Sequence, residues 1–169
     1  MLRKLLIILA LGLVLIKLAT QQQPNASPNL TFTTLNGDFV SLNTWRNKAV
    51  LITFWATDCP SCVAEIPMLR ELYQQFHPQG LEILAIAMYY DPPSHVVSLT
   101  AEQQIPYPVV LDTRAEYAQA FGNIQLVPTI LLIAPNGQIV FQHSGQLLKA
   151  QLTALISLFL PTATITNTP

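Results

Sequence analysis

The run VLITFWATDCPSC, residues 50–62, carries both cysteines of the chain, Cys59 and Cys62. Apolar, β-prone residues lead into the pair, and apolar side chains at helical spacing follow it over residues 61–76. This order predicts a strand, a tight turn and a helix, with the first sulfur at the turn, where a thiol can become reactive. Because a two-residue gap closes too small a loop to stabilise much by chain entropy, the pair predicts dithiol–disulfide exchange rather than a structural bridge.

The composition is that of one folded domain. The chain has 169 residues, of which 51% are hydrophobic and only 10% are charged, so it is long enough to bury a sizeable core. The formal net charge is -1, which gives no electrostatic basis for binding nucleic acid.

The two ends differ from the middle of the chain. Residues 1–20, MLRKLLIILALGLVLIKLAT, place basic residues before an apolar run, which is the order of an export signal. We interpret this segment as an uncleaved signal anchor, with a cleaved signal peptide as the alternative. A single anchor would hold the protein in the inner (cytoplasmic) membrane, with its domain facing the periplasm or extracytoplasmic space. Residues 21–28 are expected to be a linker, 29–160 the domain and 161–169 a flexible tail.

Strand-like and helix-like segments alternate through the domain, which predicts an α/β sandwich. Turn residues at 36–38 and 135–137 predict two hairpins, the second of which adds antiparallel strands to the sheet. The expected strands are 30–35, 39–42, 49–56, 81–88, 107–112, 129–133 and 138–143, and the expected helices are 61–76, 94–104, 115–122 and 148–160.

The cysteine run and the later segment VPTILLIAPNGQIVFQHSGQLLKAQL, residues 127–152, together resemble the two halves of the thioredoxin fold. The early hairpin and the long insert from Ala87 to about Gln125 are similar to those of extracytoplasmic TlpA/ResA-type proteins. That group includes membrane-anchored thiol–disulfide oxidoreductases and the cytochrome c maturation reductases. The resemblance implies a thioredoxin-like fold: a central mixed β-sheet flanked by helices, with an N-terminal β-hairpin and a central insert.

Cys59 is the candidate nucleophile, because unpaired N–H groups at a helix N-terminus stabilise a thiolate. Cys62 is expected one turn deeper, where it attacks the mixed disulfide and releases the reduced substrate. Pro60 suits the first helical position, and Trp55 is expected to pack at the rim of the site. Both are candidate substrate contacts.

The resemblance assigns further roles. It implies that Glu65 lines the active-site cavity and manages the proton of Cys62; the alternative is an exposed acid in the first helical turn. It also implies a cis Pro128 beside the cysteines, with the Val127 backbone pairing with an extended substrate segment. Thr53 is a departure, because thioredoxin itself has a buried aspartate at this position and threonine cannot titrate.

Several functions fit these features. The leading hypothesis is reduction of disulfides in partner proteins, with apocytochrome c as one candidate and a membrane electron donor, such as a transmembrane thiol–disulfide reductase, restoring the dithiol. A disulfide-introducing oxidant is an alternative, since the direction depends on the reduction potential. A copper chaperone of this fold usually has CxxxC instead of CxxC, and a peroxidase usually has threonine where Ala56 stands. No cofactor and no metal are expected.

Overall fold

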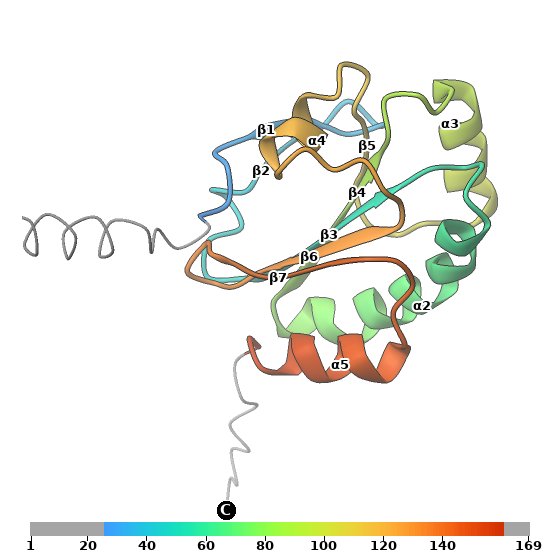
Figure 1. Cartoon of the computed structure of the whole chain (residues 1–169). Helices are drawn as coiled ribbons and strands as arrows, with labels where there is room; N and C mark the ends of the chain where they lie inside the picture. The colour runs from blue at the N-terminus through green and yellow to red at the C-terminus, as the bar shows by residue number, and fades with distance from the viewer. Residues whose placement is uncertain (1–25, 161–169) are drawn as a thin grey trace, which may run out of the picture.

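The computed structural model describes residues 26–160, and Figure 1 shows how their helices and strands are arranged. The expected signal anchor, the tail at 161–169 and most of the expected linker lie outside the described residues. Between residues 26 and 160, no helix combines the length and the apolar character needed to cross a bilayer.

A five-stranded mixed sheet in the order β5-β4-β3-β6-β7 forms the centre of the domain. The cysteine run supplies its middle strand, β3 (Ala49–Trp55), which is parallel to β4 (Leu81–Ala87); β4 is in turn parallel to β5 (Val109–Leu111). On the other side β6 (Thr129–Ile133) runs antiparallel to β3, and β7 (Ile139–Ser144) runs antiparallel to β6. This mixed sheet confirms the predicted fold class.

Helices and a hairpin cover the sheet on its two faces (Figure 1). The remaining elements are β1 (Thr31–Thr33), β2 (Phe39–Ser41), α2 (Pro60–Phe76), the short 3-10 helix η1 (His77–Gln79), α3 (Pro93–Glu102), α4 (Glu116–Ala120) and α5 (Lys149–Ser157). One hydrophobic cluster joins the sheet to α2, α3 and α5. A second cluster joins the opposite face to the hairpin β1–β2 and α4.

The position of β3 in the middle of the sheet explains why its sequence is almost continuously apolar. Leu51 and Trp55 belong to the cluster beneath α2, whereas Ile52 and Phe54 belong to the cluster beneath the hairpin and α4. Successive side chains of a strand point to opposite faces, and both faces are covered here. β3 therefore carries an apolar side chain at nearly every position.

The insert between Ala87 and Gln125 contributes α3, β5 and α4, so it belongs to the central sheet as well as to its covering layers. The predicted strand at 107–112 shrinks to β5, because Pro108 has no N–H to donate to a neighbouring strand. The N-terminal hairpin lies along β5, where the Leu35 N–H donates to the Val109 carbonyl at 2.9 Å. The hairpin thereby covers a sheet edge that would otherwise be open to pairing.

Candidate active site

Cys59 caps the N-terminus of α2. The loop from Ala56 to Asp58 follows the end of β3, and the Cys59 sulfur accepts a hydrogen bond from the Cys62 N–H at 3.2 Å. Pro60 is the first helical residue, where a missing N–H costs nothing. The predicted strand, turn and helix around the cysteines are all present.

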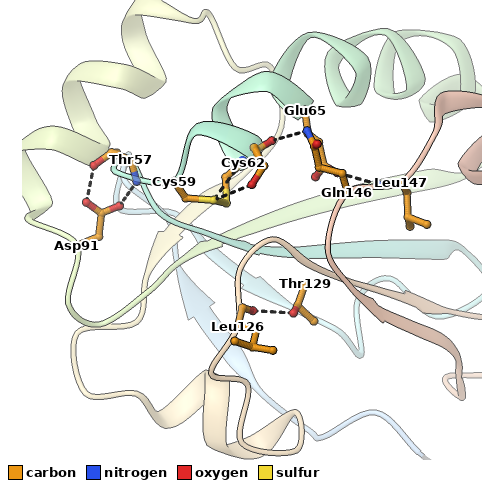
Figure 2. Close-up of a disulfide and its surroundings, with 10 residues drawn as sticks. Thr57, Cys59, Cys62, Glu65, Asp91, Leu126, Thr129, Gln146 and Leu147 are labelled. Atoms are coloured by element: carbon orange, nitrogen blue, oxygen red, sulfur yellow. Dashed lines mark hydrogen bonds between the residues drawn. A yellow bond between two sulfur atoms is a disulfide. The ribbon is translucent and has the colours of Figure 1, made fainter.

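The two cysteines form a disulfide in this structure (Figure 2). Cys59 is partly exposed, whereas Cys62 is only 3% exposed and packs into the cluster beneath α2. The Ser61 hydroxyl oxygen lies 3.3 Å from the Cys59 sulfur. A partner thiol or disulfide can therefore reach the first sulfur much more easily than the second.

Trp55 lies beneath the cysteine pair instead of at its rim. Its side chain is 3% exposed and shares the cluster of Cys62, because its position in β3 points it to the face that α2 covers. It offers a partner almost no surface, contrary to the expectation of a substrate contact. Thr53, on the same face of the strand, lines a small pocket of about 10 Å³ together with Trp55, Cys62 and Tyr107. A hydroxyl that does not titrate thus stands behind the second cysteine.

The peptide bond between Val127 and Pro128 is cis, as predicted. Val127 is half-buried and Pro128 is buried. The loop is held by two hydrogen bonds: the Thr129 hydroxyl donates to the Leu126 carbonyl at 2.6 Å (Figure 2), and the Gly145 N–H donates to the Pro128 carbonyl at 2.8 Å.

Glu65 is a buried acid, 4% exposed, which contradicts the alternative of an exposed first-turn carboxylate. One carboxyl oxygen accepts a hydrogen bond from the Leu147 N–H at 3.1 Å (Figure 2). The other is buried without a hydrogen-bond partner among the described residues. Burial raises the pKa of Glu65, and the bond from Leu147 partly offsets this rise.

The loop between β7 and α5 joins the separate parts of the site, and sequence reasoning missed it. The Gln146 amide donates to the Ser61 carbonyl at 3.4 Å, while its neighbours Gly145 and Leu147 reach Pro128 and Glu65. One short segment thus contacts both the first turns of α2 and the cis-proline loop.

Asp91, just after β4, was also missed. Its buried carboxylate accepts from the N–H of Thr57 at 2.7 Å and from the Thr57 hydroxyl at 2.6 Å (Figure 2). The signal that could have found it is its place after a parallel strand beside β3, since the carboxyl ends of parallel strands meet at one edge of a sheet. The neighbouring Tyr90 is partly exposed, and its pKa is raised by burial and then by the negative charges of Asp58 and Asp91.

Within residues 26–160, no three histidine, cysteine or acidic side chains come together as a metal site would require. A Cys-x-x-Cys disulfide at the start of the helix that follows the middle strand, together with a cis-proline before the neighbouring antiparallel strand, on a sheet of this order, defines a thioredoxin-fold protein.

Comparisons with known proteins agree with this class. The Redoxin family model matches residues 21–156. The thiol-disulfide oxidoreductase ResA of Halalkalibacterium halodurans is 30% identical over 135 residues, which cover 80% of this chain and 76% of that protein. ResA of Bacillus subtilis is 29% identical over 135 residues, which cover 80% of this chain and 74% of that protein.

Solved structures show the same likeness. A thiol:disulfide interchange protein of the thioredoxin family from Chlorobium tepidum superposes with a TM-score of 0.75 at 26% identity, covering 81% of this chain and 97% of that one. The chain therefore belongs to the Redoxin family and, within it, to the ResA-like thiol–disulfide oxidoreductases. Membership of this family implies disulfide-containing proteins as substrates.

Proposed function

We propose that the protein works as a reductant of partner disulfides on the outer side of the cytoplasmic membrane. Cys59 is the nucleophile and Cys62 the resolving thiol. The apolar residues 1–20 support the anchor and the location, because a basic start followed by an apolar run directs export. Disulfides in cytochrome c maturation are the proposed substrates, on the resemblance to that group.

The reaction is a two-electron exchange. The Cys59 thiolate attacks one sulfur of the partner disulfide, forming a mixed disulfide and releasing the partner's other sulfur as a thiolate, which takes a proton. Cys62 then loses its proton and attacks the Cys59 sulfur, which releases the second partner thiol and leaves the Cys59–Cys62 disulfide. A membrane electron donor then reduces the Cys59–Cys62 disulfide back to the dithiol, while the donor's own dithiol is oxidised to a disulfide. Glu65, buried three residues beyond Cys62 on α2, is the proposed acceptor of the Cys62 proton.

The observation that carries the nucleophile assignment is the difference in exposure of the two sulfurs, one reachable and one buried. The direction is supported by acidic groups near the nucleophile. Asp58 directly precedes Cys59, and the Asp91 carboxylate accepts a hydrogen bond from Thr57, the residue before Asp58. Negative charge disfavours the thiolate, so it favours the disulfide over the dithiol and makes the couple more reducing.

Substrate contact is proposed for the exposed Pro60 and for the cis-proline loop. Among the described residues, no backbone hydrogen bond uses the N–H or the carbonyl of Val127. Beside Pro128 this backbone is free to pair with an extended substrate segment, as an edge strand does.

A trapping experiment tests the proposal. We expect Cys62→Ser, expressed as the full-length chain, to accumulate mixed disulfides through Cys59 with exported proteins, because the resolving step is lost. Cys59→Ser and the double serine variant are the matched controls and should trap nothing. Non-reducing electrophoresis and mass spectrometry would identify the adducts. Absence of any adduct with an exported protein, or trapping by Cys59→Ser instead, would contradict the assignment.

A further inference from the structure

The carboxylate of Asp91 accepts two hydrogen bonds from the loop that precedes the nucleophile. Asp91 is 6% exposed, and both of its oxygens accept hydrogen bonds from Thr57, one from the backbone and one from the side chain (Figure 2). An ionised carboxylate has acceptors only, so two donors suit it well.

Asp91 is itself fixed to the sheet. Its N–H donates to the Met88 carbonyl at 3.0 Å, and the Met88 N–H donates to the Trp55 carbonyl at 3.0 Å. Met88 directly follows β4, and Trp55 is the last residue of β3. The carboxylate therefore fixes Thr57 relative to the ends of the two paired central strands, β3 and β4.

Thr57 lies two residues before Cys59 in a short turn, in which the Cys59 N–H donates to the Ala56 carbonyl at 3.3 Å. We propose that Asp91 is a positioning residue for thiol–disulfide exchange, which fixes the Thr57 loop and with it the Cys59 sulfur, and whose charge favours the disulfide form of the couple. The inference rests on the proposed role of Cys59 but holds for either direction of electron flow.

Position and charge can be separated by the choice of variant. Asp91→Ala removes both hydrogen bonds and the charge. Asp91→Asn keeps the shape and one carbonyl oxygen for the Thr57 N–H, while its amide can face the Thr57 hydroxyl, so mainly the charge is lost. Thr57→Val removes only the hydrogen bond that the side-chain hydroxyl donates, whereas Thr57→Ser keeps that hydroxyl.

Asp112 provides a matched control. It is likewise buried, at 2% exposure, and its carboxylate accepts from two N–H groups, those of Tyr117 at 3.1 Å and Ala118 at 2.8 Å. These bonds hold the start of α4 and involve no residue of the Cys59 loop. Asp112→Ala should therefore weaken the fold without altering the reactivity of Cys59.

The experiment uses the reduced full-length protein in mild detergent, below the unfolding range of every variant. Two quantities are measured: the second-order rate constant with 4,4′-dithiodipyridine, an uncharged disulfide, and the equilibrium constant of the couple against glutathione. We expect Asp91→Ala to slow the reaction about tenfold and Thr57→Val about threefold, because misplaced reacting atoms lose rate steeply. Asp91→Asn and Thr57→Ser should stay within about threefold of wild type in rate.

The charge is tested by the equilibrium constant. Asp91→Asn should move it toward the dithiol by about threefold, because a nearby negative charge no longer opposes the thiolate. An Asp91→Ala rate within twofold of wild type, or equal slowing by Asp112→Ala, would overturn the positioning role. An unchanged equilibrium in Asp91→Asn would overturn the role of the charge. Failure of the proposed nucleophile would show separately, as undiminished exchange by Cys59→Ser.

Discussion

Glu65 combines a titratable group with a structural contact, since its buried carboxyl group holds the Leu147 backbone. Its pKa in the folded protein lies above the ordinary value of 4.5, mainly because burial disfavours the charged form. The folded protein therefore binds this proton more tightly than the unfolded chain does. The resulting stabilisation is fully present below pH 4.5 and is lost as the pH rises through the folded pKa.

Glu65→Gln tests this linkage, because glutamine does not titrate but can still accept the bond from Leu147. We expect the free energy of unfolding of wild type, minus that of Glu65→Gln, to fall as the pH is raised from 4.5 to about 8. Urea titrations of both proteins across this range provide the measurement. A difference that stays flat, or rises with pH, would show that burial does not penalise the charged carboxylate.

Turns of the same backbone geometry can differ in what surrounds them. Gly37 in the β1–β2 turn and Gly137 in the β6–β7 turn both have φ of +84°, which favours glycine. A Cβ at Gly37 would meet nothing within 4 Å, whereas a Cβ at Gly137 would collide with the Arg46 guanidinium. That guanidinium donates to the Asn136 carbonyl at 3.0 Å.

We therefore expect Gly37→Ala to cost about 1–2 kcal/mol of unfolding free energy from backbone strain alone. Gly137→Ala should cost roughly 0.5–1 kcal/mol more, because Arg46 must move and its hydrogen bond is lost. Urea unfolding of the two variants gives the comparison. The excess should vanish when both are repeated in an Arg46→Ala background, and equal costs in the natural background would refute the role of Arg46.

The elements themselves could be predicted from sequence because their signals are local. The run of apolar residues gave β3, the helical spacing gave α2, and the Asn36-Gly37-Asp38 turn gave the hairpin. The contacts between loops had no such signal. Asp91 meets Thr57 across 34 residues and Leu147 meets Glu65 across 82, and only the assembled sheet brings them together. For the same reason the sequence left Glu65 open between a buried and an exposed position.

On the scale of the whole molecule, the sheet order gathers the site at one end of its two central strands. β3 leads into Cys59, β4 leads into Asp91, and the Pro128 loop enters β6 on the other side of β3. Three loops from distant parts of the chain therefore lie at the end of the sheet that carries the disulfide. Because the disulfide is part of this fold, reducing it changes the free energy of the folded state as well as that of the unfolded chain. The stability of the fold and the potential of the couple are consequently linked quantities.

A thermodynamic cycle turns this link into a prediction about the direction of electron flow. Reducing the disulfide has one free energy in the folded protein and another in the unfolded chain. The difference between these two values equals the difference in unfolding free energy between the oxidised and the reduced protein. If the fold favours the disulfide, the couple is reducing and the oxidised protein is the more stable form; an oxidant shows the opposite order. The burial of Cys62 and the carboxylates of Asp58 and Asp91 disfavour thiolates in the folded state.

We therefore expect the oxidised protein to unfold at higher urea than the protein reduced with dithiothreitol. Its free energy of unfolding should be larger by about 1.4 kcal/mol for each 30 mV that the fold lowers the reduction potential. The double serine variant should not respond to dithiothreitol. A reduced form more stable than the oxidised form would exclude the reductant and favour the disulfide-introducing alternative.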